Sequence, residues 1–146
     1  MTLERELATA LAAARSAGEL IRKEYESFVA IPDAPVTIST HADRASQDLI
    51  IAALVAAFPN DAICAEEATQ SLRDSKQSAK RVWVIDPIDG TRGFAMKNGE
   101  FSVMIGLTVD RVPVVGGDEN YRGRILQRAK MPCEFDAAHA RHLNVQ

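Results

Sequence analysis

Acidic residues follow directly on two short apolar runs, at points where the chain would leave a hydrophobic core. The pair Glu66-Glu67 follows one run, and Asp86 and Asp89 follow another. Carboxylates placed where strands end are well positioned at the edge of a sheet, where ligand sites commonly lie. Their hard oxygen atoms suit Mg²⁺. The pattern therefore places carboxylates at the ends of two apolar runs, and Asp86 and Asp89 can point at one spot and bind a divalent cation together.

The stretch from Asp86 to Thr91 is the densest part of this pattern. Pro87 fixes φ and stiffens the turn, and Gly90 allows a sharp bend and a close approach to a ligand. Thr91 is placed to begin a short helix, whose free N–H groups and dipole favour a phosphate. A cation, a helix N-terminus and a hydroxyl are together suited to phosphate-ester hydrolysis. By its spacing alone the same string is also typical of an ordinary turn, and that alternative stays open.

The surroundings of this turn resemble the signature of the inositol monophosphatase superfamily. Residues 83–94, WVIDPIDGTRGF, are similar to that signature, and more closely to its 3′(2′),5′-bisphosphate nucleotidase branch. The resemblance extends over about residues 1–116. Three further segments match in the same order: Pro35-Val36-Thr37 followed by Asp43, Phe58-Pro59 through Glu66-Glu67, and Lys97 through Val103.

The resemblance implies a metal site built from carboxylates and one backbone carbonyl. The implied Mg²⁺ ligands are Glu66, Asp86, Asp89 and the carbonyl of Ile88. Glu67 would be an additional metal partner or would support the other ligands. A complete family member would hold two or three Mg²⁺ ions.

The resemblance also implies how water and substrate would be held. Asp43 and Thr91 would orient and deprotonate the attacking water. The backbone amides of Gly90 and Thr91 would hold the phosphate, and Arg92 would help to neutralise a second phosphate. The implied substrate is a small phosphorylated molecule, preferably a 3′(2′),5′-bisphosphorylated nucleotide, with an inositol or sugar phosphate as the alternative.

Two long helices and several short strands are predicted to position these residues. Apolar residues recur at spacings of three and four over residues 2–29. Thr40 and Asp43 form a capping-box pattern that begins a second helix ending near Ala57. Strands are predicted at residues 62–65, 81–86, 101–109 and 112–115. This order predicts an α+β fold with helices packed on an antiparallel sheet, and the resemblance implies the N-terminal half of a layered αβαβα sandwich.

Composition excludes several classes of protein. The 146 residues carry a formal net charge of −3, with 47% apolar and 25% charged residues, which is ordinary globular usage. The mild acidity argues against a protein that binds nucleic acid polymers or membrane surfaces. The charged N-terminal residues do not form a signal-peptide pattern, so a cytoplasmic location is expected. The resemblance leaves a homodimer open.

Residues 117–146 do not continue the resemblance. They show no sustained helical or strand period, and they lack the Trp-Asp-x-x-Ala-like motif that supplies a further metal-binding aspartate in the family. We therefore expect an incomplete phosphatase domain at 1–116 and a frameshifted or disordered tail at 117–146. The expected activity is weak or absent, and a non-catalytic fragment or binding remnant is the alternative.

Overall fold

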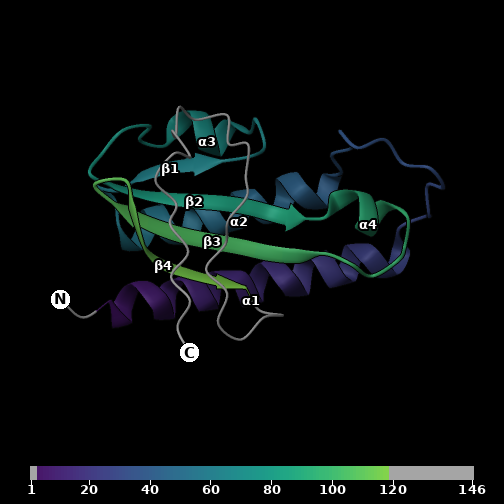
Figure 1. Ribbon diagram of the computed structural model, residues 1–146, viewed down its shortest axis with the longest axis horizontal. Coiled ribbons are helices and arrows are strands. Elements are labelled where there is room, and N and C mark those ends of the chain that lie inside the picture. The colour runs from purple at the N-terminus through teal and green to yellow at the C-terminus, as the bar shows by residue number, and fades with distance from the viewer. Residues whose placement is uncertain (1–2, 119–146) are drawn as a thin grey trace.

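Two long helices, α1 (Glu4–Ser27) and α2 (His41–Ala57), form one layer of the computed structural model, which describes residues 3–118 (Figure 1). Both occupy the positions that the apolar spacing predicts. The residues that α1 buries are mostly alanines, which allow its backbone to lie close to its neighbours. They are Ala10, Ala13, Ala14, Ala17 and Ile21.

The start of α2 is held by the predicted capping box. The backbone N–H of Thr40 donates to Asp43 Oδ2 at 2.7 Å, and the Thr40 hydroxyl donates to the same oxygen at 2.5 Å. The Thr40 side chain in turn accepts from the backbone of Asp43, which completes the motif. Because the cap uses one carboxylate oxygen, Asp43 is held in a defined orientation at the helix start.

The second layer is a four-stranded sheet in the order β1-β2-β3-β4. Its strands are β1 (Ala62–Ala65), β2 (Arg81–Asp89), β3 (Ser102–Val109) and β4 (Val112–Asp118). The predicted α+β class, with helices packed on a sheet, is confirmed. The sheet is mixed rather than wholly antiparallel, because β1 pairs with β2 in parallel. The segment containing α3 (Gln70–Asp74) returns the chain to the end where β1 began, which a parallel neighbour requires.

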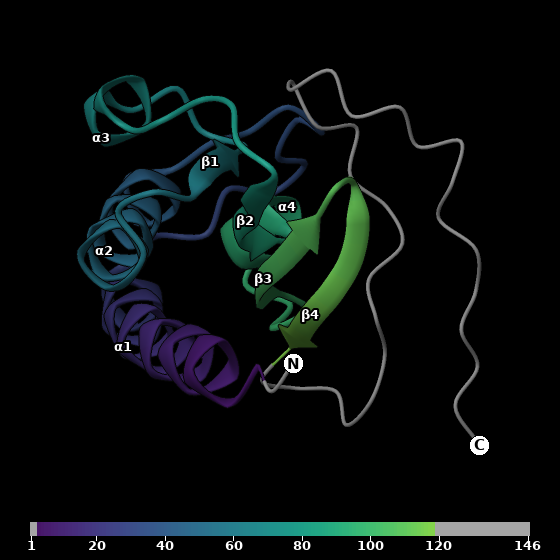
Figure 2. The same cartoon turned by 90° about the vertical axis from the view of Figure 1, so that its left-hand side faces the viewer.

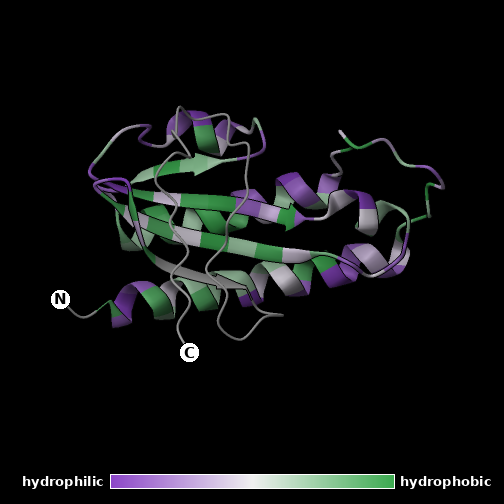
Figure 3. Cartoon of the chain, viewed as in Figure 1, coloured by the Kyte–Doolittle hydropathy of each residue, from purple (hydrophilic) through white to green (hydrophobic). Residues whose placement is uncertain are grey.

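Both long helices cover the same face of this sheet (Figure 2). Along β2 and β3, alternate side chains point into the layer between sheet and helices, as the period of two predicts. Trp83, Ile85, Ile105 and Leu107 are fully buried there. Hydrophobic colouring along the strands is interrupted by hydrophilic bands where β2 approaches its end (Figure 3). The acidic residues therefore interrupt the core rather than end it, since Ile88 and Phe94 beyond them belong to the same hydrophobic cluster.

Two strands are longer than predicted. β2 continues to Asp89, and a short helix, α4 (Thr91–Ala95), begins two residues later. β4 continues to Asp118, past the predicted domain boundary at 116. The rest of the predicted tail lies outside the described residues, so its character stays a prediction. Neither long helix of the described part has the length and apolarity that a membrane span needs.

Candidate functional site

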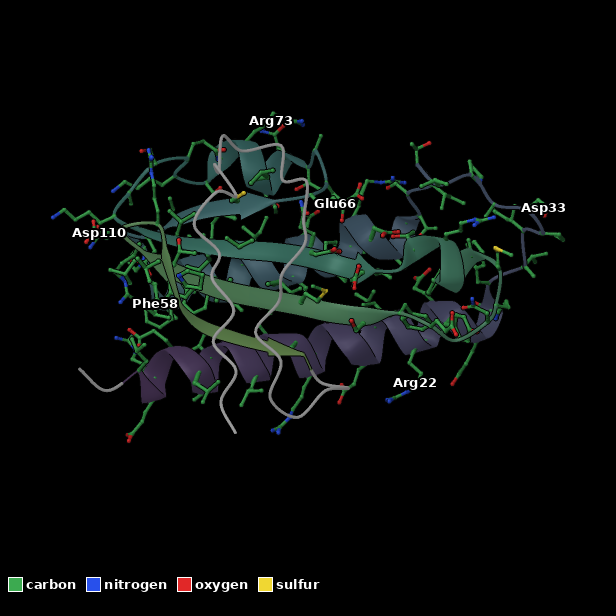
Figure 4. All side chains as sticks on the ribbon, in the orientation of Figure 1. Arg22, Asp33, Phe58, Glu66, Arg73 and Asp110 are labelled. Atoms are coloured by element: carbon green, nitrogen blue, oxygen red, sulfur yellow. The ribbon has the colours of Figure 1, made fainter. Side chains whose placement is uncertain are left out.

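The predicted acidic residues gather at one end of the sheet. β1 and β2 are parallel, and Ala65 pairs with Ile85, so Glu66 follows the end of β1 beside Asp86, which still pairs with Met104 of β3. Figure 4 shows Glu66 at this end, where β2 runs out towards α4. We call Asp43, Glu66, Glu67, Asp86 and Asp89 the acidic edge.

Asp86 has one carboxylate oxygen without a hydrogen-bond partner, although its side chain also forms a hydrogen bond with Glu66. Its Oδ1 atom is buried and has no hydrogen-bond partner among the described residues. Burial, then the charge of Glu66 and a side-chain hydrogen bond with it, and then the charges of Asp89 and Asp43 raise the pKa of Asp86 from 3.8 to about 8. A buried oxygen without a partner is costly, so this position is suited to a ligand that brings positive charge.

Glu67 has a more balanced environment than Asp86. Burial raises its pKa, while a hydrogen bond from the Ser39 hydroxyl and the nearby charge of Arg44 act in the opposite direction. The Ser39 hydroxyl donates to Glu67 Oε2 at 2.7 Å, and Arg44 donates to the Ser39 oxygen at 3.0 Å. The loop before α2 therefore contacts the acidic edge directly.

Asp43 and Thr91 meet as the resemblance implies, although they lie on different elements. Thr91 Oγ1 is 2.7 Å from Asp43 Oδ1 and 2.9 Å from the carbonyl oxygen of Ile88. A hydroxyl carries one proton, so it donates to only one of these two acceptors at a time. Asp43 is 1% exposed, and it thus joins the start of α2 to the start of α4.

The turn between β2 and α4 requires two glycines. Gly90 has a φ of 91°, which confirms its predicted role in a sharp bend. A Cβ on Gly90 would lie 2.6 Å from the carbonyl oxygen of Glu100, and one on Gly93 would lie 2.5 Å from the same atom. The close approach that was predicted between Gly90 and a ligand is therefore, in the structure, an approach to the backbone of Glu100. Gly93 was missed by the sequence reasoning, because its constraint depends on how the chain folds back after α4 to bring Glu100 against it.

Arg92 makes a contact that the sequence reasoning did not foresee. Its Nε atom donates to the carbonyl of Ala34 at 2.8 Å, which ties α4 to the loop before α2. Ala34 is buried, whereas the Arg92 side chain is exposed. The predicted contact of Arg92 with a second phosphate stays a prediction.

The acidic edge offers ligand atoms without forming a closed metal cage. Within residues 3–118, no group of three or more histidine, cysteine, aspartate or glutamate side chains is arranged to hold a metal ion. The donor chemistry nevertheless fits Mg²⁺, which prefers oxygen ligands and keeps several waters. The unpartnered Oδ1 of Asp86 is the observation that favours a cation here.

A buried glutamine supports the acidic edge and was not singled out from the sequence. The side-chain amide of Gln47 donates a hydrogen bond to the backbone carbonyl of Glu67 and accepts one from the backbone N–H of the same residue. Its spacing could have indicated it, since Gln47 lies four residues after Asp43 and therefore on the same face of the helix.

Comparison with known proteins decides the family. The family model of the Inositol monophosphatase family matches residues 2–117. The chain belongs to this family. The resemblance read from residues 83–94 and the three other segments is therefore confirmed, and it extends over nearly all of the described residues.

Relatives within the inositol monophosphatase family carry different names. Inositol monophosphatase 1 of Solanum lycopersicum is 35% identical over 116 residues, which cover 79% of this chain and 42% of the relative. The 3′(2′),5′-bisphosphate nucleotidase CysQ of Salmonella typhimurium is 34% identical over 109 residues, covering 70% and 43%. Such similar identities do not separate the predicted nucleotidase branch from the inositol monophosphatases.

A solved structure shows the same fold. The inositol monophosphatase from Anabaena (Nostoc) sp. superimposes with a TM-score of 0.63 at 30% identity, over 81% of this chain and 40% of that one. The chain spans about two fifths of the length of the relatives it matches.

Proposed function

We propose that the acidic edge takes part in the metal-dependent hydrolysis of a phosphomonoester. The observation that carries this proposal is the buried, unpartnered Oδ1 of Asp86, which lies in a group of carboxylates beside the Asp43–Thr91 pair. Carboxylates that are crowded together at one edge repel one another and lower the stability of the fold, and a bound cation would relieve that repulsion. Membership of the inositol monophosphatase family supports the same reaction class.

The proposed cation is Mg²⁺, with two or three ions in a complete family member. Glu66, Asp86 and Asp89, with the carbonyl of Ile88, would hold it, and Glu67 would support them. When bound, such ions neutralise phosphate charge and make a bound water more acidic. If the Ile88 carbonyl is engaged by a ligand, the proton of the Thr91 hydroxyl is left for Asp43, since the hydroxyl has only these two acceptors in the described residues.

Thr91 and Asp43 are proposed to move the proton of the attacking water. The Thr91 oxygen accepts a proton from the water while its own proton passes to Asp43 Oδ1. The hydrogen bonds from Thr40 keep Asp43 oriented through its other oxygen. The water oxygen then forms a bond to phosphorus as the ester P–O bond breaks, and the leaving oxygen takes a proton from solvent. The amides of Gly90 and Thr91 would hold the phosphate.

The proposed substrate is a 3′(2′),5′-bisphosphorylated nucleotide, and an inositol or sugar phosphate is the alternative. Arg92 supports the first choice, because only its Nε atom is engaged by another described residue. The outer nitrogens of its exposed guanidinium are suited to a bidentate contact with a second phosphate.

Metal binding and phosphate release test the proposal separately. The purified 146-residue chain is titrated with Mn²⁺ by electron paramagnetic resonance. It is then assayed with Mg²⁺ for phosphate release from adenosine 3′,5′-bisphosphate and from inositol 1-phosphate. Asp86→Asn is expected to abolish binding. Asp110→Asn, at an exposed turn at the opposite end of the sheet, is the matched control (Figure 4).

Each outcome of these assays has a distinct meaning. Binding with release supports the proposal, and the better substrate decides between the two candidates. Binding without release supports the alternative of a non-catalytic binding remnant. A wild-type chain that binds no Mn²⁺, or an Asp86→Asn variant that binds as well as wild type, overturns the proposal.

A further inference from the structure

Gln47 is a fully buried polar residue whose hydrogen bonds are all directed at one turn. Its Nε2 donates to the carbonyl of Glu67 at 2.7 Å, and its Oε1 accepts from the N–H of Glu67 at 2.8 Å. The side-chain amide therefore pairs with both backbone groups of one residue, as a neighbouring strand would. A weaker contact at 3.2 Å joins Nε2 to the hydroxyl of Thr69, which caps α3.

The position of Gln47 on α2 shows why its pairing with Glu67 matters. Gln47 follows Asp43 by four residues, so the two side chains leave the same face of the helix one turn apart. Asp43 contacts Thr91 in the turn after β2, and Gln47 contacts Glu67 in the turn after β1. One rigid helix thus spaces the two turns that carry the acidic edge.

The Glu66-Glu67 turn has little else in the sheet to fix it. β1 ends at Ala65, so the two glutamates lie beyond the last strand pairing, and Glu66 is exposed. The Ser39 hydroxyl holds the carboxylate of Glu67, and the N–H of Thr69 donates to the Glu67 carbonyl within the turn, so Gln47 supplies the contact that joins the Glu67 backbone to α2. Without the amide of Gln47, the N–H of Glu67 would lose the partner that it has at 2.8 Å, and the carbonyl of Glu67 would keep only the N–H of Thr69, at 2.9 Å.

We propose that Gln47 is a positioning residue, which sets the Glu66-Glu67 turn at the correct distance from the Asp43–Thr91 pair for a divalent cation to be bound. The inference rests on the proposed function, because it assigns Gln47 a part in that same site. Groups that orient metal ligands through hydrogen bonds commonly change metal affinity about 10- to 100-fold when they are replaced.

The main test replaces the amide with an apolar group of similar length. In Gln47→Met, we expect the amide hydrogen of Glu67 to exchange at least about tenfold faster in the metal-free chain. We also expect Mn²⁺ binding, followed by electron paramagnetic resonance, to weaken about 10- to 100-fold. Hydrogen exchange needs no metal and no activity, so it tests the pairing independently of the proposed function.

The matched control is Ile51→Ala, one turn further along α2. Ile51 is as buried as Gln47 and belongs to the hydrophobic core rather than to the acidic edge. Its replacement leaves a cavity and lowers the stability of the same helix without touching the Glu67 pairing. Mn²⁺ affinity is expected to stay within about twofold of wild type, although unfolding becomes easier.

A second variant keeps the proposal falsifiable if Gln47→Met does not fold. Gln47→Glu retains the shape and the oxygen that accepts from Glu67, but it lacks the amide donor. We expect weaker Mn²⁺ binding than in wild type, even though a carboxylate has been added beside a cation site. Stronger binding would show that charge rather than positioning governs the site, and it would overturn the proposal.

The remaining outcomes separate the two proposals. If wild type binds Mn²⁺ and Gln47→Met binds it equally well, the role of Gln47 is wrong and the proposed function stands. If Ile51→Ala weakens binding as much as Gln47→Met does, the effect is one of general stability and the positioning role is again wrong. If wild type binds no Mn²⁺, the proposed function fails and this inference fails with it.

Discussion

The two ends of the parallel pair β1 and β2 differ in how their charged side chains are arranged. Opposite charges are paired at one end, and carboxylates are crowded together at the other. Where the strands begin, Arg81 donates to Asp61 at 2.9 Å and to Glu6 at 2.9 Å. Trp83 donates to the second oxygen of Asp61 at 3.0 Å. We call Glu6, Asp61, Arg81 and Trp83 the paired end. Figure 4 places Phe58 at this end and Glu66 towards the other.

The directions of the pKa shifts express the same contrast. At the paired end, hydrogen bonding to Asp61 raises the pKa of Arg81, which favours its charged form. At the acidic edge, burial among carboxylates raises the pKa of Asp86, which favours its neutral form. One end therefore gains stability from its charges, whereas the other loses stability to them. A loss of stability confined to one edge is typical of a site that is completed by a ligand.

The largest expected effect on stability comes from removing the carboxylate of Asp61 at the paired end. Asp61→Ala leaves Arg81 and the indole N–H of Trp83 without their shared acceptor. We expect the free energy of unfolding to fall by about 2–4 kcal/mol, measured by urea denaturation. Mn²⁺ affinity should not change, because the acidic edge lies at the other end of the strands. A loss of Mn²⁺ affinity in the folded variant would contradict the separation of the two ends.

The pH dependence of stability should show the opposite sign at the acidic edge. Asp86 keeps its proton in the folded chain up to about pH 8, whereas in the unfolded chain it loses the proton near 3.8. Between these values the folded state binds more protons, so this group makes the free energy of unfolding decrease as pH rises. The stabilising contribution is fully present below about pH 4 and lost by about pH 8.

Asp86→Asn should remove this slope, because an amide does not titrate. At pH 8 without metal, we expect the variant to be more stable than wild type by about 1–3 kcal/mol. The measurement is urea denaturation from pH 4 to pH 8, with Asp110→Asn as the control that keeps the wild-type slope. Identical slopes in wild type and Asp86→Asn would show that Asp86 is compensated, and the contrast between the ends would fail.

The smallest expected effect concerns the Asp43–Thr91 pair, which resembles the paired end although it lies at the acidic edge. Thr91→Val removes a hydrogen bond to Asp43 while keeping the shape of the side chain. We expect a loss of stability of about 1 kcal/mol by urea denaturation, opposite in sign to Asp86→Asn. Thr91→Ser should restore most of the loss, and failure of the serine variant to do so would assign the effect to packing.

Local patterns in the sequence were sufficient for most of the elements. Apolar spacing placed α1 and α2, the Thr40–Asp43 pattern placed the start of α2, and strict alternation placed β3. Glu66, Glu67, Asp86 and Asp89 were also singled out, because they stand at the ends of apolar runs, whereas the place of Asp43 at the site came from the family resemblance. The family resemblance supplied the pairing of Asp43 with Thr91, which no spacing could supply.

Contacts between distant segments were beyond these patterns. Gln47 reaches Glu67 across 20 positions, and Arg92 reaches Ala34 across 58. The parallel pairing of β1 with β2 was missed for the same reason, because it depends on where the segment 68–80 carries the chain. The roles of such residues follow from packing, and packing is not visible within a single window of sequence.

Asp43 divides its two oxygens between two tasks, one for the helix cap and one for Thr91. A library of substitutions at this position would therefore be screened for folding before it could be screened for new chemistry. Each replacement loses the cap, which commonly contributes about 1 kcal/mol, along with the contact to Thr91. The start of α2 and the Asp43–Thr91 contact therefore depend on the same side chain, and neither can be altered by itself at this position.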